Sequence, residues 1–246
     1  MTTFSRRNFI FKTSAVAASA GLLGLTAQAS EPAIVKTMSD KKGKLLFRTL
    51  GRTGIKVPIV SMGVMNANNP ALLKEAYKHG IRHFDTAWYY QNGNNERMVG
   101  SVLRELGVKR SDGVIATKVF LSDILGNKLT GKEIKDTFLK RFAESLERLQ
   151  MDYADILYYH SIESVEMMKN PNIIEAFNEL KQQKKIRFTG ISVHVDWTDI
   201  LNKAADDGFY DVALLSYNYS MDGQQANIDA LKNAVSKGMG LIAMKT

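Results

Sequence analysis

The feature that most constrains the fold of this chain is a regular alternation of short apolar segments with amphipathic ones from residue 44 onward. The short segments are nearly continuous apolar runs, as expected for parallel strands that are buried on both faces. Seven such strands are predicted, at residues 59–64, 81–85, 114–118, 154–160, 186–192, 212–216 and 241–245. The alternation therefore indicates an α/β fold with a parallel sheet.

The segments between these strands carry signals that start and stop helices. Asn69 is a candidate N-cap, and Pro70 follows it at the first helical position. Thr130 and Glu133 have the spacing of a capping box, and an apolar stripe at helical spacing comes after them. Six intervening helices are expected, one between each pair of successive strands.

A short hairpin precedes the first predicted strand, with Gly51 and Gly54 bounding its turn. Doubly wound sheets also alternate strands with helices, but a leading hairpin and this many equal units favour a (β/α)8 TIM barrel. Seven strands and six helices stop one unit short, with Thr246 just after the seventh strand. The prediction is a barrel over residues 44–246 whose eighth βα unit is missing from this chain.

The first 29 residues have the pattern of a signal peptide. Arg6 and Arg7 precede a small, weakly apolar run at 15–25, and Ala27-Gln28-Ala29 resembles an A-x-A cleavage site. The paired arginines followed by Phe9 favour a twin-arginine signal, with an ordinary Sec signal or an uncleaved anchor as the alternatives. Residues 30–43 then form a polar linker. We expect the twin-arginine export machinery as a partner and a periplasmic or secreted location.

The composition excludes several kinds of chemistry. The 246 residues include no cysteine and only four histidines, so disulfides, a thiol nucleophile and an iron–sulfur cluster are excluded within this sequence, and no metal site is predicted. The net charge is +8, but the basic residues are spread along the chain. Nucleic acid is not an expected partner, because phosphate-backbone binding needs a focused basic patch.

Polar residues end three successive predicted strands. Asp85, Lys118 and His160 stand at these ends, and Tyr90 follows Asp85 by five residues. Barrel enzymes carry their chemistry at the C-terminal ends of the strands. A nearby ammonium stabilises a phenolate, so Lys118 is expected to lower the pKa of Tyr90 and make it a general acid, with Asp85 orienting Lys118. His160 would align a carbonyl oxygen, and the hydride for its reduction would come from a nicotinamide cofactor.

With these residues in view, the sequence resembles the aldo-keto reductase family. Residues 84–96 follow its D-T-A-x-x-Y-x-x-G-x-N-E signature, and 116–118 and 155–160 resemble the segments that carry its lysine and histidine. The resemblance implies reduction of a small aldehyde or ketone by NADPH, or alternatively NADH, with Asp85, Tyr90, Lys118 and His160 as the catalytic tetrad. It also implies that the cofactor lies extended across the barrel mouth. The candidate cofactor-binding residues are Asp85, Ser192, Tyr217 and Lys245.

The chain departs from the family pattern at two positions that hold the nicotinamide carboxamide. Val193 stands where the family has asparagine, and Leu214 stands where it has glutamine. His194 either replaces one of these amides or is an ordinary loop histidine. Trp88 and Tyr89 either form a ring-stacking wall of the site or only pack their loop.

Two other readings compete with the reductase. A non-catalytic nicotinamide-nucleotide-binding subunit would use the same barrel, as the potassium-channel β subunits of the family do. A different barrel enzyme, such as a sugar isomerase, would need clustered metal ligands at the strand ends, which this sequence lacks. Exported relatives often carry a C-terminal cysteine-rich, ferredoxin-like extension. An iron–sulfur extension beyond this chain is therefore a further expectation.

Overall fold

A computed structural model describes residues 45–121 and 129–246. The predicted signal peptide and linker, residues 1–43, lie outside the described residues. In the described part, an antiparallel hairpin of β1 (Phe47–Thr49) and β2 (Lys56–Pro58) precedes a seven-stranded sheet. The predicted hairpin is thus confirmed, and a 3-10 turn at Gly51–Thr53 joins its strands.

The sheet is parallel throughout, and its strands are ordered as they follow in the sequence. Its strands are β3 (Met62–Gly63), β4 (His83–Asp85), β5 (Val114–Val119), β6 (Ala154–Tyr159), β7 (Ile186–Val193), β8 (Val212–Ser216) and β9 (Gly240–Met244). The seven predicted strands are confirmed, although the first is shorter than predicted. They form a nearly closed barrel, one strand fewer than a (β/α)8 barrel has.

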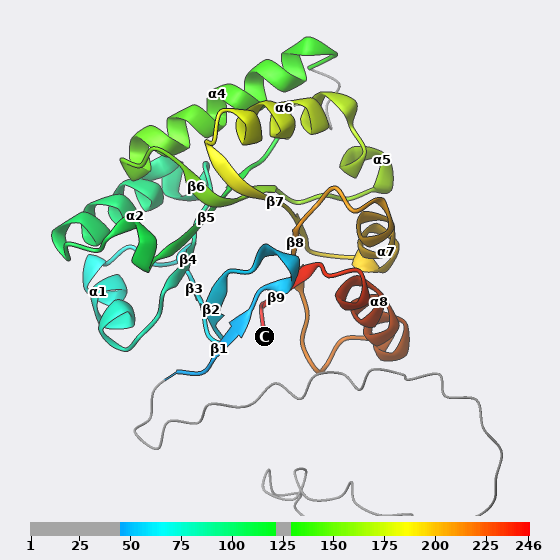
Figure 1. The fold of residues 1–246 in the computed structure, drawn as a ribbon, viewed down its shortest axis with the longest axis horizontal. Coiled ribbons are helices and arrows are strands. Elements are labelled where there is room, and N and C mark those ends of the chain that lie inside the picture. The colour runs from blue at the N-terminus through cyan, green and yellow to red at the C-terminus, as the bar shows by residue number, and fades with distance from the viewer. Residues whose placement is uncertain (1–44, 122–128) are drawn as a thin grey trace, which may run out of the picture. The chain divides into compact units, whose positions relative to one another are not determined.

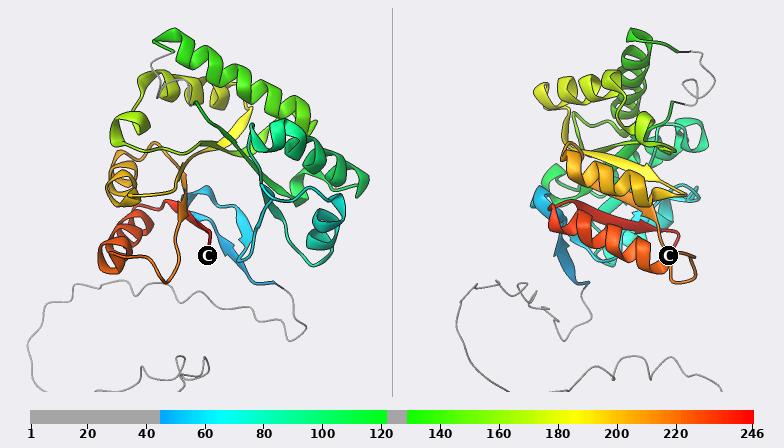
Figure 2. Two further views of the ribbon diagram at one scale, coloured as in Figure 1. Left: turned by 180° about the vertical axis from the view of Figure 1, so that it is seen from behind. Right: turned by 90° about the vertical axis from the view of Figure 1, so that its right-hand side faces the viewer.

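In the described residues, a helix of nine or more residues lies between each pair of successive strands, as the sequence predicts. These six are α1 (Pro70–Lys78), α2 (Asn94–Glu105), α4 (Lys132–Leu149), α6 (Pro171–Gln182), α7 (Trp197–Asp207) and α8 (Gln224–Ser236). A short additional helix, α5 (Val165–Met168), precedes α6. Asn69 caps α1 by accepting a hydrogen bond from Ala71 N at 2.9 Å. Figures 1 and 2 show the helices on the outside of the ring of strands.

Side chains toward the C-terminal ends of the central strands alternate between the two faces of the sheet. On β6, Leu157 and Tyr159 belong to the apolar layer beneath the helices, whereas Ile156 and Tyr158 point into the barrel. Leu50 and Val57 of the hairpin join the interior cluster, so that the hairpin fills the end of the barrel where the strands begin. The other end, where the strands finish, stays free for polar side chains.

Arg52 fixes the hairpin to that N-terminal end. Its guanidinium donates hydrogen bonds to the carbonyl oxygens of Gly208 at 2.8 Å and Tyr210 at 2.7 Å, and its Nε lies 3.2 Å from Asp211 Oδ1. These partners directly precede β8. No helix in the described part of the chain combines the length and the apolar character that crossing a bilayer requires.

Candidate active site

The C-terminal ends of neighbouring strands bring the predicted catalytic residues together. Asp85 ends β4, Lys118 lies one residue before the end of β5, and His160 directly follows β6. Lys118 and His160 are spaced by two from Ala116 and Tyr158 of the interior cluster. Asp85 follows Phe84, which packs on the opposite face of β4, so all three side chains face the barrel mouth. Three polar side chains from three consecutive strands therefore converge at one place.

Lys118 is the centre of this cluster. Its side chain is 1% exposed, and its ammonium forms an ion pair with Asp85 Oδ1. The same ammonium donates to the carbonyl oxygen of Thr86 at 2.7 Å and to Tyr90 Oη at 3.5 Å. Burial lowers the pKa of Lys118, and the charge of Asp85 opposes that shift. Asp85 thus stabilises a positive charge beside the Tyr90 hydroxyl.

The loop that presents Tyr90 is held by the residues of its sequence signature. Asn95 accepts a hydrogen bond from Thr86 Oγ1 at 2.8 Å and donates to the carbonyl oxygen of Val64 at 2.6 Å. Gly93 has φ +82°, and a Cβ there would lie 2.6 Å from the guanidinium carbon of Arg148. The asparagine and the glycine of the signature therefore shape the loop rather than take part in chemistry.

Glu96 anchors the same loop from below. It is fully buried, accepts a hydrogen bond from Thr117 Oγ1 at 2.6 Å and lies 3.4 Å from Arg148 Nη1. Burial raises its pKa, against the lowering effect of these partners. Arg148 also donates to the carbonyl oxygen of Trp88 at 2.7 Å, so α4 fixes the segment that leads to Tyr90.

The predicted lowering of the Tyr90 pKa is wrong for this structure. Burial raises the pKa of Tyr90 above its usual range, and the charge of Asp85 raises it further. The physical reason is that Lys118 is already paired with Asp85, so the phenol faces a nearly neutral ion pair. Tyr90 therefore stays fully protonated, which is the form that an acid must have before it reacts.

His160 lies in an aromatic setting and is 1% exposed. Its ring centroid is 5.4 Å from that of Tyr89, 5.8 Å from that of Tyr90 and 6.0 Å from that of Phe120. Burial, together with the charge of Lys118, lowers the pKa of His160 to about 2. The imidazole is therefore neutral near pH 7, with one N–H to donate.

The structure shows different roles for Trp88 and Tyr89, which the sequence places either in a wall of the site or only in the packing of their loop. Tyr89 is 45% exposed and joins the rings around His160, so it forms a wall of the site. Trp88 instead donates from Nε1 to Glu144 Oε2 on α4 at 2.7 Å, and the guanidinium of Arg141 lies over its ring. Trp88 therefore packs the loop against α4, and Tyr89 faces the candidate site beside His160.

Ser192 and two neighbours form the next part of the mouth. Ser192 is fully buried, and its hydroxyl oxygen accepts from Ser161 N at 3.0 Å, while its proton has no acceptor among the described residues. His194 Nδ1 lies 3.4 Å from Ser216 Oγ, and the His194 ring is 6.1 Å from that of His160. These hydroxyl and imidazole groups suit an amide such as a nicotinamide carboxamide.

A family model describes this arrangement across most of the chain. The model for the aldo/keto reductase family matches residues 62–246. The chain belongs to the aldo/keto reductase family. Among curated relatives, L-galactose dehydrogenase of Arabidopsis thaliana is 36% identical over 215 residues, covering 81% of this chain and 65% of that protein. A putative voltage-gated potassium channel subunit β of Schizosaccharomyces pombe is 37% identical over 160 residues, covering 59% of this chain and 44% of that protein.

Solved structures agree with the barrel. An aldo-keto reductase from Bacillus halodurans, described as its holo form, superposes with a TM-score of 0.64 and is 26% identical, covering 81% of this chain and 65% of that one. The matched part of the chain spans 65% of the length of L-galactose dehydrogenase and 44% of the length of the channel subunit β named above. The family model therefore confirms the resemblance to the aldo-keto reductases that was inferred from residues 84–96.

The departures from the aldo/keto reductase pattern have structural reasons. Val193 is fully buried in the apolar layer beneath the helices, on the opposite face from Ser192. Leu214 belongs to the apolar interior, and the polar residue at the mouth of β8 is Ser216, two positions later. Ser216 was missed in the sequence, although the period of two along a strand could have identified it.

Two predicted cofactor-binding residues do not join the tetrad. The Tyr217 ring lies 6.0 Å from that of Trp197, and its hydroxyl donates to Gln224 Oε1 at 3.3 Å, on the helix side of the sheet. Lys245 is exposed just beyond β9. Its charge helps to lower the pKa of His194, after the larger effect of burial, so it acts at the edge of the same mouth.

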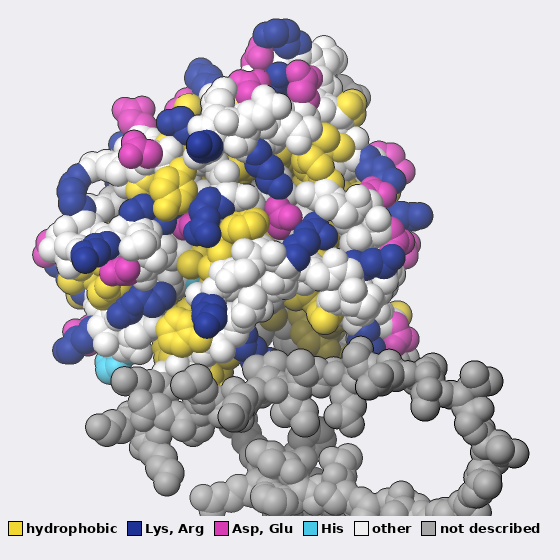
Figure 3. Space-filling view, in the orientation of Figure 1, with side chains coloured by type: hydrophobic (Ala, Val, Ile, Leu, Met, Phe, Trp, Pro, Cys, Tyr) yellow, Lys and Arg dark blue, Asp and Glu magenta, His cyan; other side chains and the backbone are white. Residues whose placement is uncertain are grey.

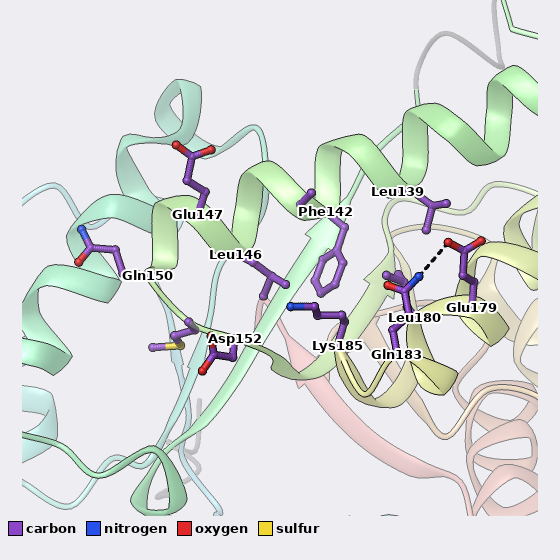
Figure 4. A pocket seen from close by; sticks show the side chains of 12 residues that line it. Leu139, Phe142, Leu146, Glu147, Gln150, Asp152, Glu179, Leu180, Gln183 and Lys185 are labelled. Carbon is purple, nitrogen blue, oxygen red and sulfur yellow. Dashed lines mark hydrogen bonds between the residues drawn. The ribbon is translucent and has the colours of Figure 1, made fainter.

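Other surfaces of the described chain differ from this site. A pocket of about 510 Å³ lies outside the barrel between α4 and α6, and no tetrad residue lines it (Figure 4). Phe142 and Leu146 form its floor, with Glu179 and Gln183 at its rim. On the face in Figure 3, basic and acidic side chains are interspersed. Within residues 45–121 and 129–246, no three His, Asp or Glu residues are grouped so that they could hold a metal ion.

Proposed function

We propose that this protein reduces an aldehyde or ketone to an alcohol with a nicotinamide dinucleotide, NADPH or alternatively NADH. The observation that carries the proposal is the position of Lys118, whose ammonium pairs with Asp85 and lies 3.5 Å from the Tyr90 hydroxyl. A buried phenol next to a buried cation has no evident structural use. It does suit a reaction in which a phenol gives up its proton.

The cofactor would lie at the mouth beside Ser192, His194 and Ser216. Asp85 and Ser192 are its candidate ligands at the nicotinamide end, with Tyr217 and Lys245 as further candidates. Ser192 has a hydroxyl proton to donate, and His194 and Ser216 supply further polar groups, so the set fits an amide. A reduced nicotinamide supplies a hydride, which no side chain can provide.

The tetrad would supply the other half of the reduction. Neutral His160 donates its N–H to the carbonyl oxygen and orients it. As negative charge develops on that oxygen, Tyr90 transfers its proton there, because an alkoxide is a stronger base than a phenolate. The phenolate that remains is stabilised by the Lys118 ammonium. A raised pKa of Tyr90 at rest is compatible with this order of events.

The proposal is tested by steady-state oxidation of NADPH with a panel of small aldehydes, beside a fluorescence titration of nucleotide binding. Tyr90→Phe keeps the ring and removes only the hydroxyl, so turnover should fall while binding of NADPH stays nearly unchanged. Turnover of Tyr90→Phe at the wild-type rate would exclude tyrosine-acid reduction.

A second candidate is a non-catalytic nucleotide-binding subunit on the same barrel. Its support is the similarity to a potassium channel subunit β named above. Tight nucleotide binding without oxidation by any aldehyde, in wild type and Tyr90→Phe alike, would favour this alternative.

We also propose export through the twin-arginine route, based on Arg6, Arg7 and the segment 27–29. Arg6→Lys combined with Arg7→Lys should leave unprocessed precursor in the cytoplasm, as cell fractionation and the N-terminal sequence would show. Lys12→Arg keeps the charge and the arginine pair, so it serves as the control. Normal processing of the double variant would contradict the proposed route.

A further inference from the structure

A tyrosine lies inside the barrel directly below the tetrad. Tyr158 is fully buried, faces the interior from β6 and pairs in register with Lys118 of β5. Gly190 of β7 makes room for its ring, since a Cβ at Gly190 would lie 2.4 Å from Tyr158 Cδ1. The ring is thus closely packed, and a phenylalanine would pack in the same way. The hydroxyl is the part that packing does not require.

Three interior polar atoms near this point have no hydrogen-bond partner within the described chain. They are Tyr158 Oη, Asp85 Oδ2 and His83 Nε2. His83 lies two residues before Asp85 on β4, is 1% exposed, and its Nδ1 is 2.9 Å from Ser61 Oγ. Leaving a buried polar atom unpaired is costly, so three such atoms on the interior face of β4 and β6 indicate a shared partner.

The three side chains belong to the same region of the barrel. Side chains from alternate strands of such a barrel meet in layers, and β4 and β6 are alternate strands. The charge of Asp85 acts on both Tyr158 and His83, which places them within its field. The other groups that face this region are Lys118 of β5, Tyr90 of the loop after β4, and His160 after β6. Three further charged or titratable groups act on them electrostatically: Glu96 on Lys118, His194 on His160, and Asp155 on His83.

We propose that Tyr158 is a positioning residue, whose hydroxyl binds one internal water that also contacts Asp85 Oδ2 and His83 Nε2. Donors and acceptors balance in this arrangement. The water accepts from the Tyr158 hydroxyl and donates to the Asp85 carboxylate and to His83, whose Nδ1–H donates to Ser61. The network fixes the orientation of the Asp85 carboxylate, whose other oxygen pairs with the Lys118 ammonium beside Tyr90.

The consequence for Lys118 follows from the sign of each interaction. Loss of the Tyr158 hydroxyl weakens the hydrogen bonding of the charged carboxylate. A carboxylate that is less firmly oriented toward the ammonium opposes the effect of burial on Lys118 less strongly, so Lys118 gives up its proton at lower pH. Tyr158→Phe should therefore reduce the proton affinity of Lys118 about 3–10-fold, which moves its titration by about 0.5–1 pH unit.

The neighbouring residue offers a matched control. Tyr159 is also fully buried with an unpartnered hydroxyl in the described chain, but it faces the apolar layer under the helices. Tyr159→Phe removes the same group one residue away, on the opposite face of β6. This variant should leave the titration of Lys118 unchanged.

The experiment combines a measurement on the protein itself with one on its activity. Titration of the Lys118 side-chain nitrogen by ¹⁵N NMR should move to lower pH in Tyr158→Phe only. A high-resolution crystal structure of the wild type should show a water within hydrogen-bond distance of the three atoms. Because this inference rests on the proposed reductase function, the alkaline limb of the kcat/KM profile should move by the same amount as the NMR titration.

These readouts separate the two ideas. An NMR shift in a protein that reduces no carbonyl supports the network and overturns the proposed function. Carbonyl reduction with an unchanged Lys118 titration in Tyr158→Phe, or with an equal shift in Tyr159→Phe, overturns the network and leaves the function standing. Direct contact of the three side chains with no water in the crystal structure would also overturn it.

Discussion

The two ends of the barrel differ in how completely their buried carboxylates are paired. At the N-terminal end, Asp155 is 1% exposed and several donors are directed at its two oxygens. It accepts from Ile115 N at 2.9 Å and lies 2.7 Å from the guanidinium nitrogens of both Arg110 and Arg187. Asp211 is similarly surrounded by Arg52, Lys181 and Thr189.

At the C-terminal end, the pairing is incomplete by comparison. Asp85 shares one oxygen with Lys118 and leaves the other without a partner in the described chain, and His160 Nδ1 is unpartnered there too. Burial works against the charged forms of Lys118 and His160 and against ionisation of Tyr90. Polar atoms without partners are costly for stability but are available to a ligand.

This difference indicates that the N-terminal end of the barrel contributes mainly to stability, whereas the C-terminal end carries the candidate active site. Asp155 is the second residue of β6 and forms ion pairs with two neighbouring segments, whereas His160 directly follows the strand and is proposed to orient the substrate carbonyl. This division is the one expected for (β/α) barrels, and it can be broken experimentally. Substitutions at the mouth should change turnover more than stability, and substitutions at the other end should do the reverse.

The largest effect is expected for the proton-donating pair. Tyr90→Phe and Lys118→Met should each lower carbonyl reduction by about 10²–10⁴-fold, the range for a positioned acid. Because both disable one proton transfer, the double variant should lose less than the product of the two losses. Steady-state NADPH oxidation measures the rates, and urea unfolding checks that Tyr90→Phe keeps wild-type stability. Fully multiplicative losses would show that the two residues act in separate steps.

The reverse pattern is expected at the N-terminal end. Asp155→Asn removes a buried charge that two arginines face, so the free energy of unfolding should fall by about 3–5 kcal/mol. The lower part of that range is expected because Arg187 is half-exposed and can be rehydrated. Urea unfolding measures the loss, and kcat/KM per folded molecule should stay within about twofold of wild type. A variant that is stable but slow would break the division between the two ends.

A smaller effect is expected in the pH dependence of stability. The His160 pKa of about 2 lies below its usual value of 6.5, so below pH 6.5 the unfolded chain binds a proton that the folded chain cannot. Stability contributed by neutral His160 is present above pH 6.5 and falls by about 1 kcal/mol per unit as the pH drops below it.

The test compares urea unfolding at pH 7.5 and 5.5. His160→Gln cannot take up a proton, so its stability should depend less on pH than that of wild type. His79→Gln removes an exposed imidazole at the C-cap of α1 and is the control. Equal slopes in wild type and His160→Gln would mean that the His160 ring is accessible to water in solution.

The sequence predicts the strands well because β5, β6 and β8 are fully buried runs, and an almost continuous apolar composition is typical of such strands. It predicts the tetrad because strand ends on parallel neighbours must meet, as Asp85 and Lys118 do. The direction of the Tyr90 pKa shift could not be derived in this way. It depends on how deeply the phenol is buried and on the fact that Asp85 neutralises the field of Lys118.

The cofactor side was harder to predict for a related reason. Alignment of the family motif draws attention to Val193 and Leu214, but a strand sends alternate residues to opposite faces. Val193 therefore packs beneath the helices, so an asparagine introduced there would be buried among apolar side chains instead of reaching a nucleotide. Ser216 takes the position at the mouth, and the period of two from Leu214 along the predicted strand 212–216 could have identified it.

The smallest expected effect is at this cofactor side and returns to the comparison of the two ends. Ser216→Ala removes the hydroxyl that lies 3.4 Å from His194 Nδ1. A neutral hydrogen bond contributes about 0.5–1.5 kcal/mol, so the Kd for NADPH should rise about 2–10-fold, with little change in unfolding. Thr189→Val is the counterpart at the other end, where the hydroxyl donates to the carbonyl oxygen of Phe209 at 2.9 Å. Its Kd should equal that of wild type while its stability falls. Nucleotide titration and urea unfolding of both variants test whether Ser216→Ala changes mainly the Kd and Thr189→Val mainly the stability. An unchanged Kd for NADPH in Ser216→Ala would show that Ser216 is not part of the cofactor site.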